Sequence, residues 1–257
     1  MLVGTMALNL RTLQWNIGGG KVRRGEAGPY DHDDLSHIID TIQRLAPDIV
    51  TLQEAHTGNG VMQAATIAAA TGLVHFVNDP YSQSHLEAGM QASQAILSRF
   101  PLEAHDFNFL PNPDLSATGP DGNRWVTFDK GVSRVLCQLP DGQDMDVVTL
   151  HAVPFGHFKR SPLDAEFAPI RHRLAELARP QQLLALVQGD FNNEAPTLAD
   201  YVPDLVSRMT EAPLPGPTIP KGKYLDHVLY RGLTLRSVAV VTDVLTDHYP
   251  VLCHFDF

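Results

Sequence analysis

Short apolar segments of strand length recur along the whole chain and limit the folds that it can adopt. We expect strands at residues 10–16, 48–54, 73–77, 92–98, 131–139, 146–151, 183–188, 224–231, 234–241 and 251–257. Helical periodicity is found at residues 33–46, 61–71 and 164–178. Strands and helices do not alternate strictly, which disfavours a TIM barrel or a Rossmann sheet. The pattern favours two stacked sheets flanked by helices.

Turn and cap residues support several of these boundaries. Asp33 or Asp34 is suited to cap the first helix, because a carboxylate can accept the free backbone N–H groups there. Pro47 is expected to end that helix. Asp141-Gly142 lies between two strand segments and predicts a hairpin turn.

Length and composition indicate an ordinary globular protein. The chain has 257 residues, of which 44% are hydrophobic and 19% are charged. No repeat or linker interrupts it, so we expect one domain over residues 10–257 after a short extension over residues 1–9. Cys137 and Cys253 lie far apart in apolar segments, which disfavours a disulfide framework or zinc cluster and favours buried thiols.

The net charge and the first residues of the sequence limit which binding partners and which cellular location we expect. The net charge is −10, which opposes binding to a polyanion unless a metal and a local basic loop reverse the field. The first ten residues lack a basic segment and an adequate apolar run, so they do not resemble a signal peptide. No apolar stretch has the roughly 20 residues of a membrane span. By default we expect a cytoplasmic monomer.

Polar residues of the types that bind metals or exchange protons stand where the apolar segments end. They are Asn16, Glu54, His151, Asp190 and Asn192, and Asp247-His248 precedes the last strand. A polar group leaving a buried strand is costly unless it is paired or bound to a metal. Several at one sheet edge would form a convergent site.

Each of these residues also has a structural interpretation when it is taken alone. The alternatives are a turn or helix cap for Asn16 or Glu54, a satisfied core histidine for His151, an Asx turn for Asp190 with Asn192, and a surface pair for Asp247-His248. Their common position at strand ends favours the convergent site.

Six segments, in this order, resemble the endonuclease/exonuclease/phosphatase superfamily, which has the DNase I-like fold. They are Gln14-Trp-Asn16-Ile-Gly, Asp48-Ile-Val-Thr-Leu-Gln-Glu54, Thr149-Leu-His151, Gly189-Asp-Phe-Asn192, Leu225-Asp226-His-Val and Thr246-Asp-His248-Tyr-Pro250. The resemblance spans residues 14 to 250, with Thr246 where serine is common. It implies a four-layer α/β sandwich of two stacked, mainly antiparallel sheets flanked by helices.

The resemblance implies a Mg²⁺ or Mn²⁺ ion in the cleft, with Glu54 as the principal ligand and Asn16 and Asp247 nearby. The chemistry of these side chains agrees, because hard cations prefer carboxylate, carbonyl and water oxygens. A zinc hydrolase is the alternative, since the chain has 12 histidines, but no HExxH or histidine-cluster spacing supports it.

The resemblance also assigns catalytic roles. Asp190 and Asn192 correspond to the pair that orients the attacking water and a phosphoryl oxygen. His248 corresponds to the acid–base histidine with Asp226 as its carboxylate partner, and His151 to the histidine that binds the scissile phosphate. A histidine exchanges protons near neutral pH, and a carboxylate behind it fixes its tautomer.

Two basic segments are candidates for substrate binding. Lys130 lies in a region that approaches the phosphate in several family branches, although a structural role is equally compatible with the sequence. His157, Lys159 and Arg160 lie in a loop with two phenylalanines, Phe155 and Phe158. Cationic and aromatic groups together suit a phosphate-rich or base-bearing substrate. The alternative is that the two phenylalanines anchor the loop in the core.

The sequence therefore predicts a divalent-metal-dependent phosphoester hydrolase that uses in-line attack of water. Small phosphodiesters or phosphomonoesters suit the acidic chain best, nucleic acid comes next, and lipid head groups come third. The alternative is a catalytically silent module on the same fold that binds a phosphate ligand or nucleic acid. Such a module is expected to have lost an acid–base or metal residue, whereas this chain keeps the main positions.

Overall fold

The computed structural model describes residues 9–25, 28–119 and 122–257. The extension expected at residues 1–9 lies outside the described residues except for Asn9, which begins the first strand. The division into an extension and one domain stays a prediction. Within the described ranges, no helix is long and apolar enough to cross a membrane.

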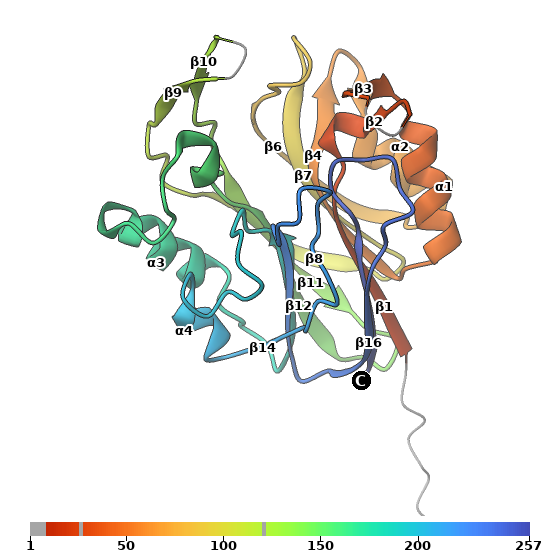
Figure 1. Ribbon diagram of the computed structural model, residues 1–257. Helices are drawn as coiled ribbons and strands as arrows, with labels where there is room; N and C mark the ends of the chain where they lie inside the picture. The colour runs from red at the N-terminus through yellow and green to blue at the C-terminus, as the bar shows by residue number, and fades with distance from the viewer. Residues whose placement is uncertain (1–8, 26–27, 120–121) are drawn as a thin grey trace, which may run out of the picture.

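Two large sheets form the centre of the molecule (Figure 1). The first has the order β16-β17-β1-β4-β7-β6, with β5 paired to β4. Its strands are β1 (Asn9–Asn16), β4 (Ile49–Gly58), β5 (Val61–Met62), β6 (His75–Gln83), β7 (Gln91–Ser98), β16 (Thr234–Val240) and β17 (Val251–Asp256). Only the β1–β4 pair in this sheet is parallel among the described strands.

The second sheet has the order β14-β15-β13-β12-β11-β8. Its strands are β8 (Leu102–Phe109), β11 (Gly131–Gln138), β12 (Asp144–His151), β13 (Leu184–Asp190), β14 (Thr210–Glu211) and β15 (Asp226–Arg231). The β12–β13 pair is parallel. Two separate ribbons are formed by β2 (Lys21–Arg23) with β3 (Tyr30–Asp33) and by β9 (Ser116–Thr118) with β10 (Arg124–Val126).

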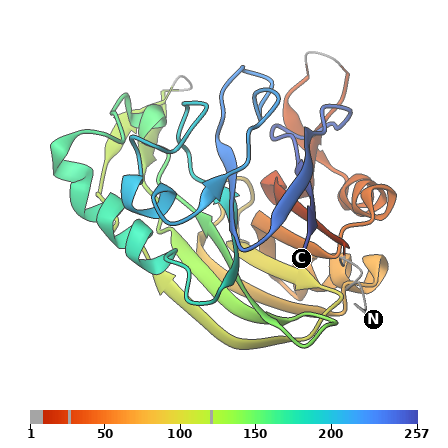
Figure 2. The same ribbon diagram turned by 90° about the horizontal axis from the view of Figure 1, so that it is seen from below.

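Helices cover the outer face of each sheet (Figures 1 and 2). The helices α1 (Leu35–Leu45) and α2 (Gln63–Thr71) lie on the first sheet, whereas α3 (Ala168–Leu177) and α4 (Pro203–Val206) lie on the second. Short 3₁₀ turns occur at Gly18–Gly20, Phe155–Phe158 and Ala165–Phe167.

Three buried apolar clusters hold these layers together. One joins α1 and α2 to the first sheet, and a second joins α3 and α4 to the other sheet. The third lies between the sheets and includes Leu10, Ile49 and Leu186. It also contains both cysteines, Cys137 and Cys253, which are free and buried as expected. The clusters define four layers, which confirms the sandwich predicted from the sequence.

Several local predictions are confirmed. Asp34 caps α1 by accepting a hydrogen bond from the His37 backbone nitrogen at 3.0 Å. Ala46, just before Pro47, ends the helix in the left-handed conformation. The turn at Asp141 and Gly142 joins β11 to β12.

Other elements differ from the prediction. β6 begins later than expected and continues to Gln83, with a register shift between Pro80 and Ser82. Proline is tolerated on such an edge strand at a bulge. β8, which was not expected, is also an edge strand, and most of its side chains are exposed. The segment expected to be helical from residue 164 starts with a 3₁₀ turn before α3.

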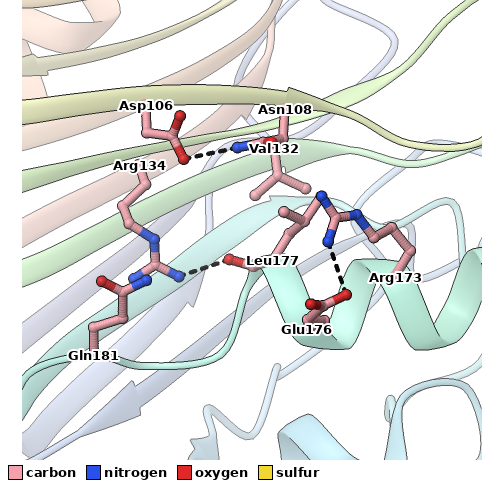
Figure 3. Close-up of a pocket in the computed structure, with 8 residues that line it drawn as sticks. All are labelled: Asp106, Asn108, Val132, Arg134, Arg173, Glu176, Leu177 and Gln181. Atoms are coloured by element: carbon pink, nitrogen blue, oxygen red, sulfur yellow. Dashed lines mark hydrogen bonds and ion pairs between the residues drawn. The ribbon is translucent and has the colours of Figure 1, made fainter.

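Arg134 has a structural role in the second sheet. Its guanidinium contacts the buried Asp146 carboxylate and donates to the carbonyl oxygens of Leu177 and Arg179, at 2.6 and 2.8 Å. Figure 3 shows it beside a cavity of about 180 Å³ between the second sheet and α3. Arg134 thus ties two strands to the C-terminal end of that helix, whose last carbonyls favour a cation.

Toward one end of the sheets, the apolar layer between them becomes polar. Alternate residues of β1 face the second sheet, so Leu10 in the inter-sheet cluster is followed on that face by Thr12, Gln14 and Asn16. Gln14 accepts a hydrogen bond from the Thr51 hydroxyl at 2.5 Å and donates to Asp226 Oδ1 at 3.2 Å. The bond to Thr51 joins neighbouring strands of the first sheet, whereas the bond to Asp226 crosses to the second sheet.

Two further glutamines extend this polar layer. Gln53 Nε2 donates to Thr149 Oγ1 at 2.9 Å. Gln188 Nε2 donates to Thr51 Oγ1 at 3.0 Å and to the Leu13 carbonyl at 3.1 Å. Buried amides are stable only when they are bonded in this way. The layer therefore fixes how the two sheets are placed relative to each other.

We expect Gln14→Leu to lower the free energy of unfolding by about 1–3 kcal/mol, the usual cost of leaving a buried polar group without its partner. The substitution keeps similar volume but removes the bonds to Thr51 and Asp226. Urea unfolding would measure the change, with Gln91→Leu at an exposed position of β7 as the control. Equal free energies of unfolding for the two variants would contradict the role assigned to the polar layer.

Candidate active site

The register of the second sheet aligns three of the predicted site residues. His151 ends β12, Asp190 ends β13 and Asp226 begins β15. His151 is paired with Asp190, and Asp190 with Asp226, in adjoining ladders. The three side chains therefore meet at one edge, and Asn16 at the end of β1 joins them from the first sheet. The residues that the sequence places at the ends of strands therefore lie close together in the structure.

Asp190 lies at the centre of this group and is buried. Its Oδ2 accepts a hydrogen bond from Asn16 Nδ2 at 3.0 Å, and its Oδ1 accepts one from the Asn192 backbone nitrogen at 2.9 Å. His151 Nε2 and His248 Nε2 lie 3.5 and 3.9 Å from Oδ2. Burial raises the pKa of Asp190 to about 7, although the neighbouring His248 acts in the opposite direction.

Asn192 takes a left-handed backbone conformation beside this carboxylate, with φ at 47°. Its Nδ2 donates to the Ala152 carbonyl at 2.9 Å. An amide nitrogen carries two hydrogens, so one donor remains for another acceptor. The bond from the Asn192 N–H group to Asp190 is that of an Asx turn, in which an aspartate accepts from the backbone two residues later.

His248 and Asp226 form a buried dyad. His248 Nδ1 lies 2.8 Å from Asp226 Oδ2, and the other Asp226 oxygen accepts from Gln14. The Trp15 indole nitrogen donates to the His248 carbonyl at 3.1 Å and fixes the backbone. Burial lowers the pKa of His248, but Asp226 outweighs this and raises the pKa well above its usual range.

His151 is held by two residues that approach from different elements. Tyr81 of β6 places its hydroxyl 2.8 Å from His151 Nδ1. Lys130 Nζ lies 3.1 Å from each ring nitrogen and stands 5.2 Å from the centre of the Tyr81 ring. Burial lowers the pKa of Lys130, and burial together with Lys130 lowers the pKa of His151 well below its usual range.

Glu54 points to the site because β4 is irregular at this residue. The register with β7 shifts between Leu52 and Ala55, and Glu54 has a φ of 56°. Such a bulge re-aims a side chain at the cost of backbone strain. Burial would raise the pKa of Glu54, but the nearby His85 and His151, together with further basic groups, lower it to about 2.

Asp247 lies in the loop before β17, next to the glycine turn that follows β1. A Cβ atom at Gly18 would lie 3.2 Å from Asp247 Oδ1, and Gly18 has a φ of 50°. Both observations explain why glycine occupies that position. Burial raises the pKa of Asp247.

Glu54, Asp247 and Asn16 could provide oxygen ligands to a cation. Among the described residues, no lysine or arginine makes an ion pair with Glu54 or Asp247. Nor do three histidine, cysteine or carboxylate side chains of that part of the chain converge in a complete metal cage. Two carboxylates and one amide suit Mg²⁺, which usually keeps several of its waters.

The predicted substrate residues are in different environments. Lys130 is buried and lies beside His151. His157 is exposed and lies against the Trp125 ring, whereas Lys159 is exposed at the end of the same 3₁₀ turn. Arg160 pairs with Glu166 and with Asp164, the latter at 3.0 Å. Contact of these four residues with a substrate stays a prediction.

The sequence did not identify Tyr81 and Gln14, which contact residues of the site, or Trp125, which contacts the candidate substrate residue His157. Gln14 lies in a matched segment and on the same strand face as Asn16, so period-two alternation could have marked it. Tyr81 follows an irregular Asp-Pro step, and Trp125 lies in a short ribbon. Their partners lie far away in the sequence, and no local spacing signals these contacts.

Residues 13–248 match the model of the Endonuclease/Exonuclease/phosphatase family. A UPF0294 protein of Vibrio cholerae is 29% identical over 136 residues, which cover 51% of this chain and 47% of that protein. The chain thus spans about half the length of this curated relative.

Solved structures share the fold. An endonuclease/exonuclease/phosphatase from Beutenbergia cavernae has a TM-score of 0.73 and 20% identity, covering 97% of this chain and 72% of that chain. The human Nocturnin catalytic domain with bound sulfate has a TM-score of 0.64 and 18% identity, covering 97% of this chain and 96% of that domain. The family match runs from the first strand to His248 and contains the whole strand-end cluster; the chain belongs to the endonuclease/exonuclease/phosphatase family.

Proposed function

We propose that the protein is a divalent-metal-dependent phosphoester hydrolase. One observation carries the proposal: Asp190, between His151 and His248, lies at the same end of the two sheets as two carboxylates that form no ion pair with a lysine or arginine among the described residues. The only ion-pair partner of these two carboxylates within those residues is the His151 ring, whose Nε2 lies 3.7 Å from Glu54 Oε1. The two carboxylates, Glu54 and Asp247, suit a cation. The group formed by Asp190, His151 and His248 suits the binding of a water molecule and of a phosphoryl oxygen.

Glu54 and Asp247, with Asn16, are the residues that would hold the ion. Their oxygen donors match the preference of Mg²⁺ and Mn²⁺ for hard ligands. When bound, such an ion would neutralise charge that grows on a phosphoryl oxygen. The half-buried carboxylates supply negative charge in a region of low dielectric, where attraction to a cation is strong.

Asp190 is the residue that would orient the attacking water and accept its proton. Asn16 and the Asn192 N–H group fix the plane of its carboxylate through one bond to each oxygen. Its raised pKa of about 7 suits proton transfer near neutral pH. A fixed carboxylate can hold water in line with the bond that breaks, opposite the leaving group.

The His248–Asp226 dyad would stabilise the negative charge that develops on an oxygen bound to phosphorus. Asp226 binds Nδ1, which leaves His248 Nε2 directed to the side of Asp190. The raised pKa of His248 favours an imidazolium, which can donate a proton or a hydrogen bond to an oxygen on phosphorus. Gln14 holds the second Asp226 oxygen, so the dyad has a fixed orientation.

Lys130 and His151 would bind the phosphate. An ammonium group has three donors, and the Tyr81 hydroxyl fixes the neighbouring imidazole. The net charge of −10 favours small phosphodiesters or phosphomonoesters over long polyanions. The bound sulfate of the human Nocturnin structure is a tetrahedral anion like phosphate, which agrees with a phosphate-binding site on this fold.

Asp226→Asn is expected to lower kcat by about 10²- to 10⁴-fold, because the His248 imidazole loses the carboxylate that holds its proton. KM should change much less, since Asp226 is buried behind the histidine. The assay would use bis-p-nitrophenyl phosphate and p-nitrophenyl phosphate with Mg²⁺. Asp243→Asn is the matched control, because Asp243 is exposed. An unchanged kcat in Asp226→Asn would exclude the dyad from the reaction.

Treatment with EDTA should abolish turnover, and Mg²⁺ or Mn²⁺ should restore it, whereas Zn²⁺ should not. Glu54→Gln should weaken Mg²⁺ binding by about tenfold or more, because the ligand set loses a charge. Isothermal titration calorimetry measures this binding independently of activity, with Glu103→Gln on the exposed side of β8 as the control. Metal-independent turnover would overturn the proposal. Metal binding without turnover of any phosphoester would instead identify a silent binding module.

A further inference from the structure

His227 is a fully buried histidine that directly follows Asp226, and the proposed chemistry does not use it. Successive side chains of a strand point to opposite faces of the sheet. Val228 belongs to the apolar cluster between the sheets, whereas Leu229 belongs to the cluster that joins α3 and α4 to the second sheet. Asp226 therefore shares the inner face with Val228, and His227 lies on the outer face with Leu229. A polar side chain that is buried there needs hydrogen-bond partners.

Both ring nitrogens of His227 face oxygen acceptors. Nδ1 lies 2.8 Å from Glu211 Oε1. Nε2 lies 2.9 Å from the Tyr224 carbonyl oxygen and 3.5 Å from that of Asn193. Glu211 also accepts from the Leu198 backbone nitrogen with both of its oxygens, at 3.2 and 3.1 Å. A neutral imidazole donates from one nitrogen only, so both contacts are hydrogen bonds when the ring is an imidazolium, whose charge the Glu211 carboxylate balances.

These contacts join three segments of the chain around one imidazole. Glu211 belongs to β14. Leu198 lies in the loop that follows Asp190 at the end of β13. Tyr224 lies in the loop that leads to Asp226 at the start of β15. The imidazole and its carboxylate partner therefore hold together the two loops that adjoin the central residues of the candidate site.

The loop after Asp190 meets this imidazole on both sides of a strained residue. Asn192 has a φ of 47°, and such a backbone persists at a residue other than glycine where the surrounding structure imposes it. The preceding Phe191 ring stands almost perpendicular to the His227 ring, with ring centres 5.8 Å apart. The following residue, Asn193, directs its carbonyl oxygen to Nε2. Both contacts therefore hold Asn192, whose N–H group donates to Asp190 Oδ1 at 2.9 Å.

We infer that His227, held by Glu211, is a positioning residue for the proposed hydrolysis. Its bonds fix the loop of Asn192 against the start of β15, so that Asp190 and Asp226 keep their relative positions. The inference rests on the proposed function. His227 acts through these residues and does not touch the substrate, because it lies on the outer face of the sheet. Displacement of a catalytic group by about 1 Å can lower a rate about 10²-fold, so loss of the imidazole should lower kcat.

NMR of the protein with labelled histidine side chains tests this arrangement without any need for turnover. The His227 ring should show two N–H groups that are protected from exchange, because both are buried and bonded. His227→Gln should also shift the signal of the His248 Nδ1–H group, since Asp226, its partner, moves. His172→Gln at an exposed position of α3 should leave that signal in place. A single N–H group on His227, or an unshifted His248 signal in His227→Gln, would overturn the inference.

A kinetic comparison separates positioning from a purely structural role. His227→Gln should lower kcat for bis-p-nitrophenyl phosphate with Mg²⁺ by about 10- to 100-fold and change KM much less. Asp146→Asn is the matched control, because it weakens the buried contact with Arg134 in the same sheet. Urea unfolding would show that both variants are destabilised, whereas the control should keep its kcat. Equal losses of kcat in the two folded variants would reduce His227 to a structural residue and overturn the inference.

Two substitutions of Glu211 test the bonds themselves. In Glu211→Gln, the amide can donate to Nδ1 of a neutral imidazole, and Nε2–H can still donate to the Tyr224 carbonyl. This variant should therefore keep most of kcat, whereas Glu211→Ala should lose as much as His227→Gln. Equal losses in the two Glu211 variants would contradict positioning through these bonds. If the unaltered protein turns over no phosphoester, the proposed function fails, and the NMR comparison still decides the role of His227.

Discussion

The hydrogen bond between Gln14 and Asp226 is the contact on which the site depends, because it joins the two sheets where the residues of the candidate site meet. Apolar packing holds the opposite end of the sandwich, but it is not directional and does not fix side-chain orientation. Directional bonds at the polar end fix the position of one sheet against the other. They place Asn16 of the first sheet on Asp190 of the second. A displacement of either sheet would separate these two residues.

In addition to the fixed placement of the two sheets, the site has local backbone strain and carboxylates with different neighbours. Glu54 and Asn192 both have positive φ values, and neither is a glycine. Strain of this kind persists only where surrounding structure imposes it, and it concentrates at functional sites. Asp190 and Asp226 lie 3.5 and 2.8 Å from histidine nitrogens, and Glu54 lies 3.7 Å from His151 Nε2. Within the described ranges, no lysine or arginine makes an ion pair with Glu54 or Asp247, the two carboxylates proposed to hold a cation.

Much of this arrangement could be predicted from the sequence, because strand ends and period-two alternation are local features. Asn16, His151 and Asp190 end buried strands, and the sheet register then brings them together. Contacts between edge strands and loops could not be predicted in this way. β8 was missed because its exposed side chains lack an apolar pattern. The Tyr81–His151 bond and the Trp125–His157 pair join distant segments without a sequence signal.

The position of β17 links the assembly of the site to the order of folding. β17 lies between β16 and β1, with Leu10 opposite Phe255, and the loop before it carries Asp247 and His248. Ribosomes release the N-terminal strands first, and pairings between distant segments form slowly. Until β17 docks, β1 presents an open backbone edge, which is prone to aggregation. The event that closes this edge also brings Asp247 and His248 to the proposed site, so a chain without β17 in place lacks these two residues and exposes an unpaired strand edge.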